Sequence, residues 1–139
     1  MPELQKHNNV KTILPNETVL HGFIEIGAAG TINAQSGQRD CGVTFVKNAA
    51  TGRYDGTIHR SYRRAVTGYA VLEGATAGTV PNAAKDAFIT GIAAASYAGT
   101  SGFSTFSIVA TAADGATATN PSSGDIITWE LVVSDSQRA

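Results

Sequence analysis

Histidine and cysteine are the side chains that could bind a metal ion or act as nucleophile and base in this 139-residue chain. The three histidines, His7, His21 and His59, are far apart in the sequence. A zinc site needs ligands at short paired spacings, such as two histidines on one helical face or a cysteine pair, and the chain has no such pair. The sequence therefore predicts no metal site and no cofactor.

Cys41 and His59 deserve a separate test, because a thiolate beside an imidazole can act as a nucleophile. Side chains alternate between the two faces of a strand. In the strand pairing that we prefer, Cys41 points into the core and His59 points to the opposite face, so the two cannot exchange a proton. We interpret Cys41 as a buried apolar residue and His59 as a cross-strand partner of Asp40.

The carboxylates are single and scattered, without the convergence in sequence that would point to a two-carboxylate hydrolase. Those considered are Glu25, Asp55, Glu73, Asp114, Asp125 and Glu130. Residues 27–30 lack the lysine and the following helix of a phosphate-binding loop, and they are predicted to form a turn. We therefore predict that the chain is not an enzyme and has no small-molecule substrate.

Arg60, Arg63 and Arg64 form the main local concentration of charge. One interpretation is a solvated strand edge that discourages pairing with other sheets. The other is a binding site for carboxylates of a neighbouring subunit, because planar guanidinium groups suit such ion pairs. The sequence leaves both open.

The elements that must position these side chains are strands. In residues 125–134, positions that are all apolar alternate with positions that are partly polar. The only tryptophan, Trp129, shares the apolar face with Ile127, Leu131 and Val133. We predict this strand to be central. Further strands are predicted at residues 18–26, 31–35, 39–46, 52–59, 65–72, 87–97 and 104–112. About eight strands without a long helical run predict an all-β antiparallel sandwich or jelly roll.

Residues 39–46 and 52–59 form the clearest hairpin, joined by a loop at residues 48–51. The preferred register sets Cys41 opposite Ile58, Val43 opposite Gly56 and Phe45 opposite Tyr54. In residues 65–72, we expect Val66, Tyr69, Val71 and Leu72 to be available for burial. The predicted core consists of Cys41, Val43, Phe45, Tyr54, Ile58, Phe106, Ile108, Ile127, Trp129, Leu131 and Val133.

Residues 1–17 are polar and are predicted to form an extended arm, separate from a sandwich domain at residues 18–139. The arm is either a frayed terminus or a segment that becomes ordered on a neighbouring subunit. In the second case its apolar residues Leu4, Val10, Ile13 and Leu14 would touch the partner. The long loop at residues 73–86, with Val80 and Pro81, is a further candidate contact surface.

Composition excludes some classes of function. The net charge is −1 and charged residues make up 15% of the chain, so the basic field on which nucleic-acid binding depends is missing. A single cysteine cannot form an internal disulfide, and no signal peptide or membrane-spanning apolar run is visible. We expect a soluble protein, made in a cytoplasm, that binds neither nucleic acid nor membrane.

Four stretches carry a family resemblance: residues 20–26 with the Gly-Ala turn that follows, residues 36–44, residues 54–62 and residues 127–134. Together they resemble small virion structural proteins of tailed bacteriophages, most nearly capsid decoration (cement) proteins of the jelly-roll type. The resemblance implies a homotrimer that binds the major capsid protein on the capsid surface and ties neighbouring capsid subunits together.

The resemblance implies a virion location after synthesis in the host cytoplasm. In that case the arm, the loop at residues 73–86 and the three arginines would contact other subunits. A competing interpretation is a carbohydrate-binding sandwich module of a phage fibre or tail. Few aromatic residues support it, since Tyr97 and Phe103 are the ones near a predicted turn.

Overall fold

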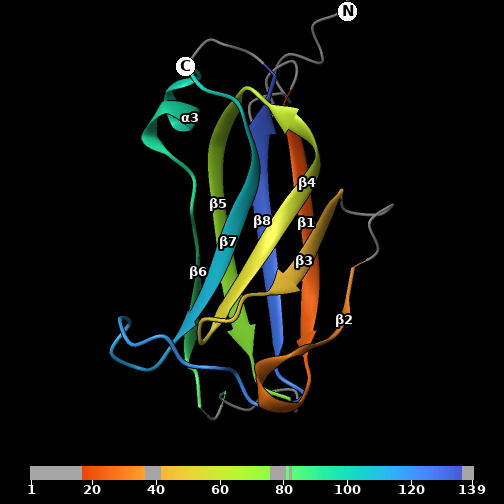
Figure 1. Ribbon diagram of the computed structural model, residues 1–139, viewed down its shortest axis with the longest axis vertical. Helices are drawn as coiled ribbons and strands as arrows, with labels where there is room; N and C mark the ends of the chain where they lie inside the picture. The colour runs from red at the N-terminus through yellow and green to blue at the C-terminus, as the bar shows by residue number, and fades with distance from the viewer. Residues whose placement is uncertain (1–16, 37–41, 76–80, 82, 136–139) are drawn as a thin grey trace, which may run out of the picture.

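The protein folds as two stacked antiparallel sheets of four strands each (Figure 1). This computed structural model describes residues 17–36, 42–75, 81 and 83–135. Its elements in chain order are β1 (Glu17–Ile26), the 3-10 turn η2 (Ala28–Gly30), β2 (Ile32–Gln35), β3 (Val43–Lys47), β4 (Arg53–Tyr62), β5 (Arg64–Glu73), β6 (Asp86–Thr90), the short helix α3 (Ala94–Ala98), β7 (Phe103–Thr111) and β8 (Ile126–Ser134).

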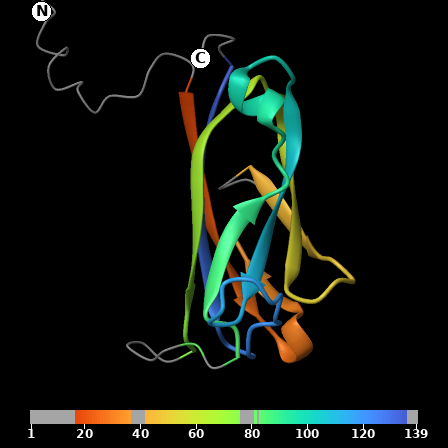
Figure 2. The same ribbon diagram turned by 90° about the vertical axis from the view of Figure 1, so that its left-hand side faces the viewer.

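The strand order is β2-β1-β8-β5 in one sheet and β3-β4-β7-β6 in the other. The chain changes sheet four times, between β2 and β3, between β4 and β5, between β5 and β6, and between β7 and β8, while β1 and β8 pair directly. Such exchanges between layers are typical of Greek-key sandwiches. Figure 2 shows the two layers side by side. The predicted all-β sandwich is confirmed.

The core lies between the sheets, and β8 is a central strand of its sheet, as the alternation of its residues predicts. The Trp129 ring meets Phe45 at 5.3 Å and Phe106 at 5.7 Å between centroids, and the two phenylalanines contact each other edge-on at 5.5 Å. Offset and edge-on aromatic contacts of this kind are favoured by the ring quadrupoles. Every predicted core residue in the described part of the chain is buried; Cys41 lies outside that part.

The register of the β3–β4 hairpin differs from the predicted one by two residues. Val43 pairs with Ile58 and Phe45 pairs with Gly56. Glycine is needed there, because a Cβ on residue 56 would lie 2.7 Å from the Phe45 ring. A shift of two residues keeps every side chain on its predicted face, so hydrophobic alternation could not distinguish the two registers.

The same shift changes the predicted partner of His59. Its N–H donates to the Gly42 carbonyl at 2.9 Å, so the pairing continues opposite Gly42. The expected partner, Asp40, lies outside the described residues. The predicted backbone register at His59 is therefore wrong, whereas a side-chain contact between His59 and Asp40 stays a prediction.

Residues 87–97, predicted as one strand, divide into two elements. β6 ends at Thr90, and α3 begins at Ala94 after Gly91, whose φ of 86° suits glycine and ends the extended run. The alanines that follow favour a helix once the sheet no longer constrains them. At the other end of the chain, Glu17 belongs to β1, one residue before the predicted start of the sandwich.

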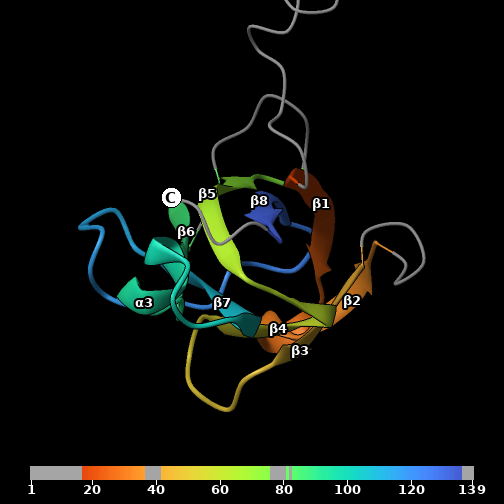
Figure 3. The ribbon, with the colours of Figure 1, turned by 90° about the horizontal axis from the view of Figure 1, so that it is seen from above.

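Gln35 joins the edge strands of the two sheets, where β2 lies beside β3 (Figure 3). Its side-chain amide donates to the Phe45 carbonyl at 3.0 Å, and its side-chain oxygen accepts the Phe45 N–H at 2.8 Å. One side chain thus occupies the hydrogen-bonding groups that a further strand would use. Unpaired strand edges invite association with other chains, and Gln35 covers this one at Phe45.

Candidate functional site

One end of the sandwich, here called the terminal end, collects residues from distant parts of the sequence (Figure 1). Ser134 pairs with Glu17 on one side and with Arg64 on the other, so the start of β1, the end of β8 and the start of β5 lie together. The tight connection between β4 and β5 brings Arg60 and Arg63 to the same end. The terminal end therefore unites the predicted arginine cluster with the point where residues 1–16 join the sandwich.

The arginines of the terminal end differ in exposure. The Arg60 guanidinium lies 2.5 Å from the Asp135 carboxylate and 4.6 Å from the centre of the Tyr62 ring, and its side chain is 59% exposed. The Arg64 side chain is only 11% exposed, with Nη2 3.9 Å from a Glu17 carboxylate oxygen. Arg63 is exposed. Arg64 is therefore largely shielded from solvent, whereas Arg60 and Arg63 are exposed, and the Arg60 guanidinium is already paired with Asp135.

The alternative interpretation of the arginines as an edge guard stays open for Arg60: β4 is an inner strand of its sheet, but its pairing with β3 ends at Ile58 and its pairing with β7 is interrupted between Thr57 and Tyr62. It fits Arg64 only in part, since β5 is an edge strand but the side chain is buried against Glu17. Exposed positive charge at the terminal end comes from Arg60 and Arg63, and the Asp135 carboxylate, 39% exposed, offsets part of it.

The second predicted contact surface lies at the opposite end. The loop between Glu73 and Asp86 is separated from Arg64 by the whole of β5, about 30 Å of extended chain. Pro81 is buried and its carbonyl accepts a hydrogen bond from Lys85 Nζ at 2.5 Å, so its ring is not presented to a partner. Val80 and the arm residues Leu4, Val10, Ile13 and Leu14 lie outside the described residues.

The outer face of the β2-β1-β8-β5 sheet presents two adjacent rows of side chains to solvent. One row runs across the sheet as His21, Glu130 and Tyr69, and the next as Phe23, Thr128 and Val71. They form a hollow of about 610 Å³, here called the outer-face groove, lined by His21, Gly22, Phe23, Ser36, Tyr69, Thr128, Trp129 and Glu130. That volume lies within the range of about 300–1,000 Å³ typical of ligand sites.

Tyr69 and Glu130 are linked within the outer-face groove. The two residues are cross-strand neighbours, and hydrogen bonding to the Glu130 carboxylate, with its negative charge, raises the pKa of the Tyr69 phenol. Tyr69 and Val71 were expected to be available for burial, and that expectation is wrong. The alternation of β5 turns Ala70 and Leu72 inward instead.

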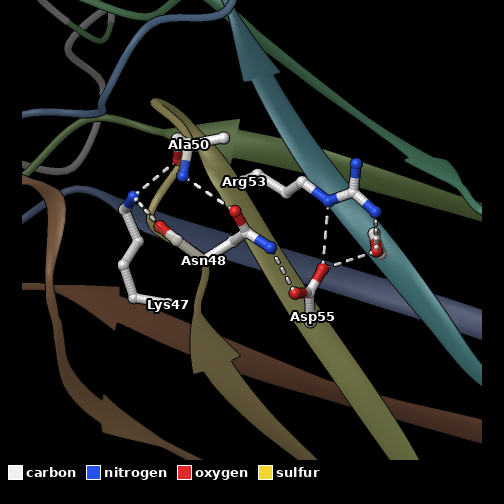
Figure 4. Close-up of polar contacts among 6 residues, drawn as sticks. Lys47, Asn48, Ala50, Arg53 and Asp55 are labelled. Atoms are coloured by element: carbon white, nitrogen blue, oxygen red, sulfur yellow. Dashed lines mark hydrogen bonds and ion pairs between the residues drawn. The ribbon is translucent and has the colours of Figure 1, made fainter.

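A polar cluster on the opposite sheet surrounds Asp55 (Figure 4). One carboxylate oxygen accepts hydrogen bonds from Ser107 Oγ at 2.8 Å and Arg53 Nε at 3.1 Å, and the other accepts from Asn48 Nδ2 at 2.7 Å. These bonds, with that from Asn48 the strongest influence, lower the pKa of Asp55. Ser107 is buried and no histidine contacts it among the described residues, so the cluster lacks the base of a serine nucleophile.

The Asp55 cluster instead fixes the β3–β4 loop (Figure 4). Lys47 Nζ donates to the carbonyls of Asn48 at 2.7 Å and Ala50 at 2.9 Å, while the Ala50 N–H donates to the Asn48 side chain at 2.7 Å. Asn48 therefore bonds to the loop on one side and to Asp55 on the other. We interpret the cluster as structural.

The two histidines in the described part of the chain lie on different sheets. His21 is on the outer face and His59 is exposed on β4, while His7 and Cys41 lie outside the described residues. Within residues 17–36, 42–75, 81 and 83–135, no group of three histidine, cysteine or acidic side chains could hold a metal ion. No helix in the described part of the chain is long and apolar enough to cross a membrane.

Fold and surfaces define an eight-stranded antiparallel β-sandwich with an exposed basic end and an exposed aromatic groove. No family model matches the chain, and no curated protein or solved structure matches it.

The outer-face groove was missed by sequence reasoning. The signal that could have found it is the period of two in residues 17–26, 64–73 and 126–134, which assigns Phe23, Tyr69 and Glu130 to the face opposite the core.

Proposed function

We propose that this chain is a virion structural protein that decorates the outside of a phage capsid by binding across neighbouring capsid subunits. The family resemblance of residues 20–26, 36–44, 54–62 and 127–134 supports this role. The partner would be the major capsid protein, and the decorating unit a homotrimer. The role needs no catalysis and no cofactor.

The observation that carries the proposal is the composition of the terminal end. Residue 16 is bonded to Glu17 at this end, and the exposed Arg60 and Arg63 lie there as well. Two features that the sequence offered separately as partner-binding elements thus adjoin one another. A decorating protein needs one attachment surface and a rigid body that stands away from it, and many copies on a lattice gain affinity by multivalency.

The attachment can be tested with capsids that lack this protein. We expect Arg60→Gln with Arg63→Gln to weaken co-sedimentation with such capsids at least tenfold, because arginine pairs with carboxylates through charge-assisted hydrogen bonds. The matched control is Arg53→Gln, on the same strand at the opposite end, whose side chain is 45% exposed. Equal binding by the double variant and the control would refute attachment through the terminal end.

A deletion tests the contribution of the N-terminal segment. Removal of residues 1–16 keeps β1 complete, so we expect the sandwich to fold while capsid association is lost. Light scattering of the full chain should give about three times the 14.3 kDa chain mass. A monomer in solution that also fails to bind capsids would exclude the decoration role.

A further inference from the structure

The outer-face groove places two exposed aromatic rings on either side of a polar floor. Phe23 on β1 and Tyr69 on β5 flank β8, whose Thr128 and Glu130 lie between them. The rings are on strands two apart and in neighbouring rows, so their Cα atoms are about 12 Å apart along a diagonal, given the usual strand spacing. Phe23 is 40% exposed and Tyr69 is 53% exposed, which leaves both rings open to a ligand.

The groove also carries polar groups beside the rings. Glu130 lies directly across from Tyr69 on the neighbouring strand, and its carboxylate can accept hydrogen bonds from a ligand because a carboxylate has about four acceptor positions. His21 pairs with Glu130 across the strands and is exposed, so its imidazole can donate or accept at the same place. The groove thus offers hydrogen-bonding groups beside aromatic surface.

The charge of this face limits the chemistry of a ligand. From the row of Val19 to the row of Glu25, the outward side chains of β1, β8 and β5 include Glu25, Glu73 and Glu130 and no lysine or arginine. Carboxylates repel anionic ligands, and single-stranded nucleic acids that stack on aromatic rings also require a positively charged groove. The face therefore disfavours anionic ligands.

We propose that the outer-face groove binds a neutral saccharide. A sugar ring has a face of C–H groups that can lie on Tyr69 or Phe23, and a rim of hydroxyls that can bond to Glu130 and His21. A shallow site on a sheet suits such a ligand, because hydroxyls that are not bound remain in water. The groove is on a sheet face and the proposed capsid attachment is at the terminal end, so each can fail without the other.

The test is a titration of the isotope-labelled full chain, followed by the NMR shifts of its backbone amides. The probes are three neutral oligosaccharides, maltotetraose, cellotetraose and N-acetylchitotetraose, with oligogalacturonate as an anionic comparison. We expect saturable shifts around His21, Phe23, Tyr69 and Glu130 with at least one neutral probe. Tyr69→Ala and Phe23→Ala should each lower the affinity about tenfold, the scale of a lost aromatic stacking contact.

The chain supplies matched controls outside the groove. Tyr97→Ala and Phe88→Ala remove the same ring types at positions that are each 43% exposed, and both variants should bind within about twofold of the wild type. Tyr69→Phe keeps the ring and should retain most of the affinity. Because all these side chains are at the surface, the variants should unfold near the wild-type urea concentration, which Trp129 fluorescence can verify.

Four results would overturn the proposal. They are an absence of shifts with all three neutral probes, a loss of binding in Tyr97→Ala instead of Tyr69→Ala, tighter binding of oligogalacturonate at the same amides, and concentration-dependent shifts of the groove amides without sugar. The last result would identify the groove as a contact between copies of this chain.

Discussion

Replacing Gln35 by alanine should remove the link between the edges of the two sheets. The side chain makes two hydrogen bonds to the backbone of Phe45, at 2.8 and 3.0 Å, and Phe45 is a buried core residue. A hydrogen bond contributes about 1 kcal/mol net, so Gln35→Ala should lower the free energy of unfolding by about 2 kcal/mol. Because water can partly reach an edge strand, it can hydrate the N–H and carbonyl of Phe45 in the variant, which limits the loss of free energy of unfolding.

The assay is urea unfolding followed by the fluorescence of Trp129, the only tryptophan and a buried one. With a denaturant slope of about 2 kcal/mol per molar, the midpoint should fall by about 1 M. Asn33→Ala is the matched control, since Asn33 lies two residues away on β2 and is exposed. Gln35→Glu should also destabilise at neutral pH, because a carboxylate cannot donate to the Phe45 carbonyl.

The uncovered edge of β3 gives a second measure of the same change. Without the Gln35 amide, the N–H and carbonyl of Phe45 become available to another strand, so Gln35→Ala should associate at concentrations where the control is dispersed. If the free energy of unfolding of Gln35→Ala stays within about 0.5 kcal/mol of Asn33→Ala, the two bonds do not hold the sheets together and the reasoning fails.

Two further substitutions test the core and a loop. Gly56→Ala should destabilise by about 1–3 kcal/mol, because the new methyl group would lie 2.7 Å from the Phe45 ring; an unchanged urea midpoint would show that the ring moves aside freely. Hydrogen bonds from Thr117 and Ala116 lower the pKa of Asp114 from its ordinary value of 3.8 to about 2. The ionised carboxylate therefore stabilises the fold at pH values above 3.8, and this stabilisation is lost as the pH falls toward 2. The difference in melting temperature between wild type and Asp114→Asn should therefore shrink from pH 6 to pH 2, with Asp86→Asn as the control for loss of charge, and a constant difference would contradict the assignment.

The sequence was sufficient to predict the strands and their inner faces wherever residues alternate strictly. In β8, Ile127, Trp129, Leu131 and Val133 are buried and the intervening residues are not, as a period of two requires. Where alternation weakens, prediction failed. Residues 87–97 contain apolar positions compatible with either period, and Gly91 with its positive φ divides them into a strand and a helix.

Pairing between strands was decided by tertiary structure. A shift of two residues in the β3–β4 hairpin leaves every side chain on the same face, so alternation cannot select the register, and the observed one places the Phe45 ring over Gly56. In the same way, the partner-binding residues could be named from the sequence but not located. Arg60 and Arg63 are exposed at the terminal end, Arg64 is buried against Glu17, and Pro81 is buried at the far end.

The sequence by itself determined the local structure of each segment. Whether a segment is extended, and which of its side chains share a face, depend on neighbouring residues. The outer-face groove was decided only by the fold. Its side chains come from residue 21, residue 69 and residue 130, which meet because β8 inserts between β1 and β5. No local pattern specifies which strand lies beside which, since backbone hydrogen bonds are the same for every pair and the choice depends on how the whole core packs.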